Sequence, residues 1–211
     1  MTLVAFDFDG TLSDSEMTVL LGEEYGVAEQ MREITQRAMN DEIGYAESLR
    51  QRAALLDGLS EGAAERAWER VELREGAAEV VQALNDAGVT TAIFTGGFET
   101  GVAAALEKAG VSVDAIVANR LPVADGALTG GVEGDLIEGT KDDALRSYAD
   151  EHGVALADTI AVGDGANDLP MLEVAGLAVG FEPKPAVEPA CDVVVETMPE
   201  LRAVLEDERV I

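Results

Sequence analysis

Apolar residues recur along this chain with two different spacings. After an apolar segment at residues 3–6, the spacing is helical as far as residue 73, and we predict helices over 16–24, 29–39, 45–57 and 61–73. From residue 76 onward, helical spacing alternates with short apolar runs. Predicted helices there cover 76–87, 98–109, 140–151, 169–175 and 199–206, and predicted strands cover 89–94, 115–117, 159–162, 178–181 and 193–195. Asp125-Gly126 predicts the turn of a β-hairpin over 121–132.

This order of elements predicts an α/β fold. Apolar strands that alternate with helices indicate a parallel sheet covered by helices on both faces. The helical block at 15–73 then interrupts the chain after the first strand. We therefore expect a core made of residues 1–14 and 74–211, with 15–73 as a helical insertion.

Composition limits the kinds of partner. The chain has 42 acidic residues against 14 basic ones and a formal charge of −28, so we expect neither nucleic acid nor an anionic membrane as a partner. The acids are scattered along the chain, whereas an acidic binding tail would be a block. Scattered acids, few lysines and few aromatics favour a halophilic protein, because molar salt shortens the Debye length to about 3 Å. A single cysteine, Cys191, short apolar runs and no signal-peptide pattern lead us to expect a soluble, cytoplasmic protein.

Two carboxylates follow the first predicted strand, in FDFDGT at residues 6–11. Asp7 and Asp9 are two residues apart, and side chains with that spacing start out on the same side of a strand. Like charges this close repel each other unless one carries a proton or a cation lies between them. The pair therefore indicates chemistry, although Asp and Gly are also common in ordinary turns.

Two later predicted strands also end in polar, glycine-rich segments. TGGF at 95–98 and GDGAND at 163–168 each stand at the start of a predicted helix, and Lys141 begins the helix before the second of these strands. Ligands of open α/β sheets bind beyond the carboxyl ends of the strands, so these segments are expected to meet. Each segment alone also fits a turn, a helix cap or a solvated surface position. Their joint occurrence in this order is what favours a binding site.

A phosphate ester would give each of these groups a use. Mg²⁺ binds few carboxylates and bridges to phosphate oxygens, and Asp7 and Asp164 can supply those carboxylates from adjacent strand ends. An anionic Asp7 can attack phosphorus once the phosphoryl charge is neutralised. The neutralising groups would be Lys141, the hydroxyl of Thr95 and the backbone N–H groups of Gly96 and Gly97 at a helix N-terminus. Asp9 would protonate the leaving alkoxide and later activate water.

In their order, DFDGT, TGGF, Lys141 and GDGAND resemble the four motifs of the haloacid dehalogenase superfamily over residues 7–168. The resemblance implies a Rossmann-like parallel sheet core covered by helices, with a small helical cap inserted after the first strand. It also implies that Asp7 is the nucleophile, that Asp9 is the acid/base, and that Mg²⁺ is the cofactor. The presence of Asp9 favours phosphate transfer, because the dehalogenases lack this second aspartate. The implied metal ligands are Asp7, Asp9, Asp164 and Asp168.

The predicted cap further resembles that of the phosphoserine phosphatase family, in Arg37-Ala38-Met39 and in SLRQR at 48–52. The resemblance implies that Glu16 holds the substrate ammonium and that Arg52 clamps its carboxylate, a task that suits a bidentate guanidinium. It also implies an apolar lid from Met39 and Tyr45, and Asn167 near the phosphate. By position alone, these residues also fit other interpretations. Glu16 fits the first turn of a helix, and Met39 fits core packing between helices. Arg52 fits a surface position on a helix, and Arg50 is then an equally good candidate for binding the carboxylate.

We therefore predict a Mg²⁺-dependent phosphatase of serine biosynthesis that hydrolyses O-phospho-L-serine to L-serine and phosphate through an aspartyl-phosphate. Its partner would be this small phosphorylated amino acid, and the expected state is a monomer or homodimer. One alternative is the same chemistry on phosphohomoserine or a sugar phosphate. Others are phosphate exchange with serine, and a receiver-like module without enzymatic turnover.

Overall fold

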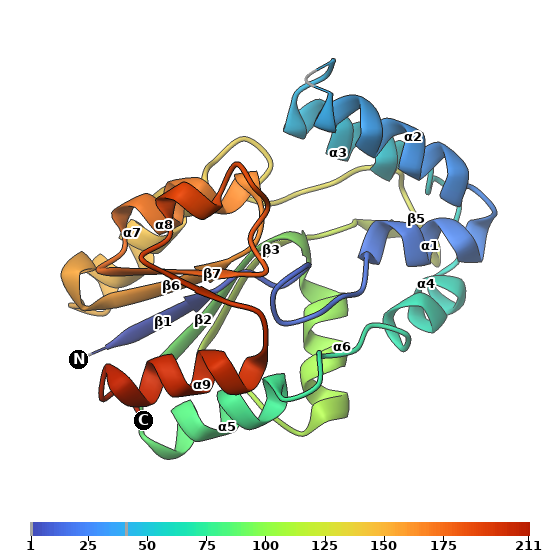
Figure 1. Ribbon diagram of the computed structural model, residues 1–211. Coiled ribbons are helices and arrows are strands. Elements are labelled where there is room, and N and C mark those ends of the chain that lie inside the picture. Colours follow the sequence, from blue (N-terminus) through green and yellow to red (C-terminus); the bar gives the residue numbers. More distant parts are fainter. Residues whose placement is uncertain (1, 41) are drawn as a thin grey trace.

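A parallel sheet forms the centre of the molecule in this computed structural model, which describes residues 2–40 and 42–211. Within these residues the sheet has six strands in the order β3-β2-β1-β6-β7-β8 (Figure 1). The strands are β1 (Leu3–Phe6), β2 (Thr90–Phe98), β3 (Ala115–Asn119), β6 (Thr159–Gly163), β7 (Leu177–Phe181) and β8 (Val193–Val195), and a separate hairpin pairs β4 (Val123–Ala124) with β5 (Ala127–Leu128). The predicted α/β fold with a parallel sheet is confirmed.

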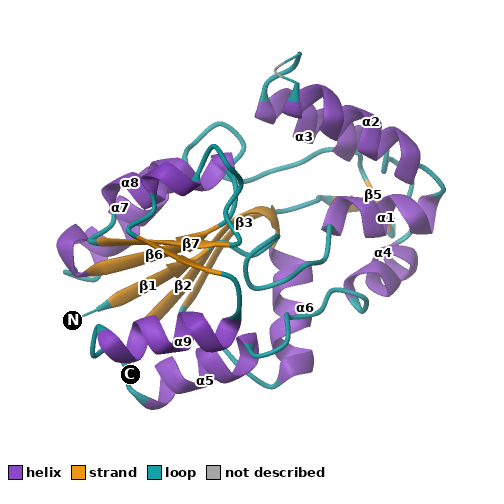
Figure 2. Ribbon diagram, in the orientation of Figure 1, coloured by secondary structure: helices purple, strands orange, loops and turns teal. Residues whose placement is uncertain are grey.

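Helices cover both faces of the sheet (Figure 2). One face carries α7 (Lys141–Glu151) and α8 (Leu169–Val174), and the other carries α5 (Ala77–Asp86), α6 (Glu99–Ala109) and α9 (Met198–Asp207). Alternate residues of β1 divide between the two cores: Leu3 and Ala5 pack on the α7–α8 side, and Val4 and Phe6 pack on the other. This two-sided burial explains why the strand is apolar at every position.

Four more helices lie together beyond the carboxyl ends of the strands (Figure 1). They are α1 (Met17–Tyr25), α2 (Ala28–Met39), α3 (Tyr45–Ala54) and α4 (Glu61–Trp68). Gly26 ends α1 with a left-handed φ of 78°, the conformation that favours glycine after a helix. No helix of the described residues is long and apolar enough to cross a membrane.

Two of these helices end earlier than predicted, at Ala54 rather than 57 and at Trp68 rather than 73. The residues after Trp68 run beside the loop that follows β1. There the Ser13 hydroxyl donates to the Glu72 carbonyl at 2.6 Å, and the Arg74 N–H donates to the Leu12 carbonyl at 2.8 Å. These hydrogen bonds between distant parts of the chain replace the helical ones.

The strand before TGGF is longer than predicted. We expected it to end at 94, but β2 continues to Phe98, with a shift in its register against β3 between Phe94 and Phe98. Helix α6 begins at Glu99, one residue later than predicted, with Phe98 at its N-cap, so Gly96 and Gly97 belong to the strand and lie directly before the helix. Glycine has no side chain that could reveal the period of a strand, and the sequence pattern therefore missed this extension.

Strand β1 lies at the switch point of the sheet. The chain proceeds from β1 to β2 and β3 on one side and later fills the other side with β6, β7 and β8. Phe6 of β1 pairs with Val162 of β6, and the Asp7 N–H continues this pairing by donating to the Val162 carbonyl at 2.9 Å. The crevice beyond β1 and β6 is therefore the place where such a sheet binds ligands.

Candidate active site

Three buried carboxylates meet beyond the ends of β1 and β6. Oxygen atoms of Asp7, Asp164 and Asp168 lie within 4.8 Å of one another, and the three residues are 2%, 8% and 0% exposed. Gly10 allows the loops to approach: its φ is 101°, and a Cβ there would lie 2.6 Å from the Asp164 carboxylate. Carboxylates this buried need positive partners or hydrogen-bond donors.

Lys141 is the buried cation of this cluster. It is the first residue of α7, and its Nζ forms ion pairs with Asp7 and, at 2.5 Å, with Asp168 Oδ1. Burial lowers the pKa of Lys141, but Asp168 and Asp7 raise it above its ordinary value, so the amine stays charged. The other oxygen of Asp168 accepts the N–H groups of Asp164 and Gly165 at 2.9 and 2.8 Å.

Asp7 and Asp9 lie in different surroundings. Asp7 bonds Lys141 through Oδ1, whereas its buried Oδ2 has no hydrogen-bond partner among the described residues. Burial and the charge of Asp168 raise the pKa of Asp7 to about 7 against the opposing effect of Lys141. Asp9 lies towards β2, where a Cβ on Gly97 would be 2.6 Å from its Oδ2. Burial, followed by the charges of Asp7 and Glu16, raises the pKa of Asp9 well above its ordinary value, which favours its protonated form.

The acidic trio of Asp7, Asp164 and Asp168 could hold a metal ion. Divalent cations such as Mg²⁺ take oxygen ligands from a small number of carboxylates, and the Oδ2 atom of Asp7 is a buried acceptor that lacks a donor within the described residues. A cation would also relieve the repulsion that raises the pKa of Asp7. The carboxylate of Asp9 is not part of the trio, so its part in metal binding stays a prediction.

The end of β2 brings Thr95, Gly96 and Gly97 to the same crevice. The buried Thr95 hydroxyl accepts the Gly97 N–H at 3.0 Å. The Gly96 carbonyl accepts two hydrogen bonds, from Asn119 Nδ2 at 3.0 Å and from the Tyr45 hydroxyl at 3.2 Å. A Cβ at Gly96 would lie 2.0 Å from that hydroxyl, so glycine is needed for the contact between α3 and β2.

Arg52, which the resemblance favours, and Arg50, which is equally suited by position alone, contact different groups. Arg52 Nη1 donates to the Thr18 hydroxyl of α1 at 3.1 Å. Burial lowers the pKa of Arg52, while Tyr45, Glu16 and Asp9 oppose this, so Arg52 lies within reach of their charges. Arg50 instead pairs with Glu138 at 2.5 Å. The two arginines are therefore separated: Arg52 bonds α1, the helix that follows Glu16, and Arg50 bonds Glu138, which lies shortly before α7.

Glu16 immediately precedes α1, at its N-cap position, and is exposed. Its side chain makes no capping hydrogen bond within the described residues, and its place directly before the first turn keeps the helix-dipole interpretation open. Met39 is the last residue of α2, and its side chain lies outside the part of the chain that the structure describes. Of the two residues predicted to form an apolar lid, the structure therefore describes the side chain of Tyr45 alone, which is 41% exposed.

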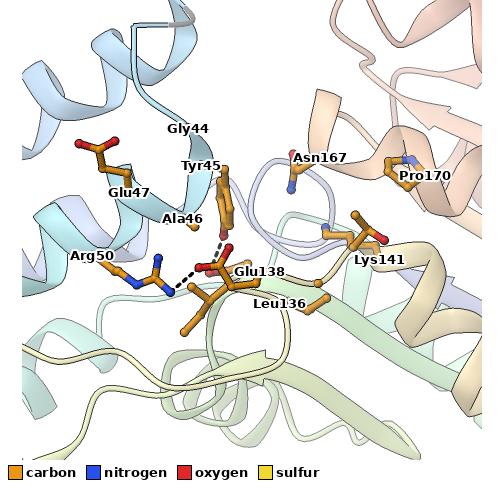
Figure 3. A pocket seen from close by; sticks show the side chains of 14 residues that line it. Gly44, Tyr45, Ala46, Glu47, Arg50, Leu136, Glu138, Lys141, Asn167 and Pro170 are labelled. Atoms are coloured by element: carbon orange, nitrogen blue, oxygen red, sulfur yellow. Dashed lines mark hydrogen bonds and ion pairs between the residues drawn. The ribbon is translucent and has the colours of Figure 1, made fainter.

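A cleft of about 560 Å³ separates α3 from the core. Figure 3 shows Tyr45 and Arg50 on the α3 side of this cleft, with Lys141, Asn167 and Pro170 across from them. The Arg50–Glu138 ion pair and the Tyr45–Gly96 hydrogen bond join its two sides. The cleft thus reaches Lys141, the residue that pairs with Asp7 and Asp168 of the buried trio.

Sequence reasoning missed two residues beside this site. Lys184 pairs with Asp164 Oδ2 at 3.0 Å, and Asn119, fully buried in β3, supports Gly96. A signal for Lys184 exists in the composition, because the chain has three lysines and two of them, Lys141 and Lys184, contact the acidic trio. In a chain this acidic, a lysine indicates a position where a positive charge is needed.

The chain belongs to the haloacid dehalogenase-like hydrolases, whose family model matches residues 4–173. Within that class its relatives are phosphoserine phosphatases. One from Halobacterium salinarum is 54% identical over 98% of both chains, which also fits the halophilic interpretation of the composition. Two solved phosphoserine phosphatase structures, one with substrate bound and one with an analogue of the phospho-aspartyl intermediate, have TM-scores of 0.87 and 0.86. They are 39% and 40% identical to this chain, and each match covers 97% of both chains. The resemblance inferred from the motifs is confirmed.

Proposed function

We propose that this chain is a Mg²⁺-dependent phosphoserine phosphatase, which hydrolyses O-phospho-L-serine to L-serine and phosphate. The observation that carries the proposal is the cluster of Asp7, Asp164, Asp168 and Lys141 at the switch point of the sheet. The similarity to phosphoserine phosphatases over nearly the whole chain supports this substrate.

In the first step, Asp7 is the nucleophile. One of its oxygens forms a bond to phosphorus as the bond between phosphorus and the serine oxygen breaks, which leaves an aspartyl-phosphate. Asp7 fits this role because it is buried beyond the end of β1 and Lys141 holds its carboxylate through Oδ1. The phospho-aspartyl analogue in a related structure supports the intermediate. A Mg²⁺ ion held by Asp7, Asp164 and Asp168 would supply positive charge to the phosphoryl oxygens.

Asp9 is the acid/base of both steps. As an acid it gives its proton to the departing serine oxygen, and as a base it then takes a proton from the water that attacks the aspartyl-phosphate. The raised pKa of Asp9 supports the first of these tasks. The Thr95 hydroxyl and the N–H groups of Gly96 and Gly97 would turn from their present contacts towards the phosphoryl oxygens, with Asn167 beside them.

Residues 15–73 form the cap domain in this proposal, and residues 1–14 with 74–211 form the core. Arg52 binds the carboxylate of the substrate and Glu16 binds its ammonium group, and Met39 and Tyr45 close over them. Support comes from Arg52, which lies within the fields of both Glu16 and Asp9. Closure of the cap would exclude water from the phosphoryl group. We also infer a cytoplasmic enzyme, present as a monomer or homodimer, since its acidity suits a salt-rich interior.

Phosphate release from a panel of phosphorylated metabolites, in high salt with Mg²⁺ or with EDTA, tests the proposal. We expect Mg²⁺-dependent turnover with a strong preference for L-phosphoserine. Equal activity on phosphohomoserine or sugar phosphates would contradict phosphoserine as the specific substrate but would agree with the proposed phosphatase reaction. A chain that becomes phosphorylated without steady turnover would instead be a receiver-like module.

A further inference from the structure

Arg74 joins three segments that surround the acidic trio, although it lies outside the motifs. Its Nη2 donates to the Gly10 carbonyl at 3.0 Å, and its Nη1 pairs with Glu182 at 2.5 Å, just after β7. Its backbone N–H bonds Leu12, and its guanidinium carbon lies 5.1 Å from the centre of the Phe181 ring. One side chain thus contacts the loop after β1 and the end of β7.

The hydrogen bond to Gly10 acts at a sensitive position in the loop. Gly10 directly follows Asp9, and its α-carbon is so close to Asp164 that a Cβ would lie 2.6 Å from the carboxylate. Its φ of 101° belongs to a region where glycine has little intrinsic preference for one conformation. A fixed donor on the Gly10 carbonyl therefore restricts the Gly10–Thr11 peptide, and with it the residue that follows Asp9 and lies against Asp164.

Arg74 is itself held firmly enough for this task. Its side chain is 25% exposed, whereas that of Arg202 beside the same surface cleft is 47% exposed and pairs with Glu206 on its own helix. Glu182 adopts a left-handed φ of 42°, a conformation that is unfavourable for a residue with a side chain. Backbone strain of this kind persists where the surrounding structure imposes it. Here the strained residue is the one whose carboxylate pairs with Arg74.

We propose that Arg74 is a positioning residue for the phosphatase reaction. It touches neither substrate nor metal, and it acts by holding the Gly10 carbonyl so that Asp9 and Asp164 keep their separation. This inference rests on the function proposed above. It predicts a defect in the chemical steps and leaves recognition by Arg52 and Glu16 intact.

Steady-state kinetics of Arg74→Ala test the inference, with L-phosphoserine and p-nitrophenyl phosphate as substrates in high salt with Mg²⁺. We expect kcat to fall by about 10- to 100-fold on both substrates, as for other supporting residues, while KM changes by less than about twofold. Arg74→Lys should lie between the two, because an ammonium group keeps the charge but cannot bind two acceptors as a planar fork does. Arg202→Ala, in the same cleft, is the matched control and should behave as the unchanged chain.

Thermal unfolding identifies variants that have lost their fold. The side chain of Arg74 borders an existing cleft of about 680 Å³, so its truncation enlarges a solvent-filled space and a folded variant is expected. If Arg74→Ala does not fold, Arg74→Lys and Glu182→Gln carry the test. A folded set with unchanged kcat, or with a change in KM alone, would overturn the inference. If the wild-type chain hydrolyses p-nitrophenyl phosphate but not phosphoserine, only the proposed substrate is refuted. If it hydrolyses neither compound, both proposals are refuted.

Discussion

The charged groups beyond the ends of β1 and β6 are almost inaccessible to solvent, whereas the ion pair between α3 and the loop before α7 is exposed. Asp7, Lys141 and Asp168 are at most 4% exposed and are bonded to one another. The ion pair that spans the cleft, from Arg50 of α3 to Glu138 in the loop before α7, has side chains that are 53% and 70% exposed. Buried charges are tolerated only with nearly complete sets of partners, while an exposed pair contributes about 0–1 kcal/mol. The buried cluster is therefore held in place by its own ion pairs, whereas the exposed ion pair contributes little to the attachment of α3.

The two connections between these regions lie next to each other. Residues 12–15 lead into α1 and residues 72–74 lead back, and they are joined by the Ser13–Glu72 and Arg74–Leu12 hydrogen bonds. A pair of adjacent connections can act as a hinge, since a small change in both segments turns the whole helical block. The comparison thus predicts large, substrate-independent effects from changes at the strand ends and smaller, substrate-dependent effects from changes on the helices.

The largest effect is expected from Asp7→Asn. An amide cannot form the aspartyl-phosphate, so turnover should fall by roughly 10⁴-fold or more with every substrate. The measurement is phosphate release in high salt with Mg²⁺, and Asp150→Asn, an exposed change on α7, is the control. Activity near the wild-type level in Asp7→Asn would refute the mechanism.

Arg52→Ala should separate recognition from chemistry. Loss of a charged, bidentate contact of about 3 kcal/mol corresponds to roughly a 100-fold lower kcat/KM for L-phosphoserine. p-Nitrophenyl phosphate has no carboxylate to bind, so its kcat/KM should change by less than about fivefold. Arg50→Ala serves as the matched control from the same helix. Equal losses on both substrates would mean that Arg52 does not bind the carboxylate.

Mg²⁺ should stabilise the fold more at about pH 8 than at about pH 5.5. The pKa of Asp7 is raised from 3.8 to about 7, so its contribution to stability is full below pH 3.8 and is lost as the pH rises through 7. A cation in the trio replaces the lost proton, and we expect it to raise Tm by about 2–4 °C at the higher pH. Thermal unfolding in high salt, with Mg²⁺ or EDTA, measures this. The same shift at both pH values, or a similar shift in Asp7→Asn, would count against the metal site.

The smallest effect is expected at the ion pair between the two sides of the cleft. Arg50→Glu should lower kcat/KM by about fivefold or less, since the pair is exposed and contributes at most about 1 kcal/mol. Adding Glu138→Arg should restore the activity by exchanging the charges. The effect should also shrink as salt increases, because exposed charges are screened. A large loss of kcat/KM that does not depend on salt would instead show that this ion pair is coupled to the buried charges around Asp7.

Most elements could be predicted from the sequence because their signals are local. The helix ended by Gly110 and the strand at Val193–Val195 lie where the pattern placed them. The extension of β2 through Gly96 and Gly97 could not be predicted, because two glycines carry no periodic signal. The early end of α4 at Trp68 depends on hydrogen bonds to the loop at 12–15, which is distant in the sequence.

For the site, the sequence by itself determined which groups are available: carboxylates at the ends of β1 and β6, a glycine-rich end of β2 and Lys141 at the start of a helix. These follow from residue type and order along a parallel sheet. Only the tertiary structure decided how closely the oxygens of Asp7, Asp164 and Asp168 approach one another, that Arg52 bonds α1 while Arg50 pairs with Glu138, and that Asn119, Lys184 and Arg74 support the loops. The physical reason is that burial and electrostatic coupling depend on distances between segments far apart in the chain, and packing sets those distances.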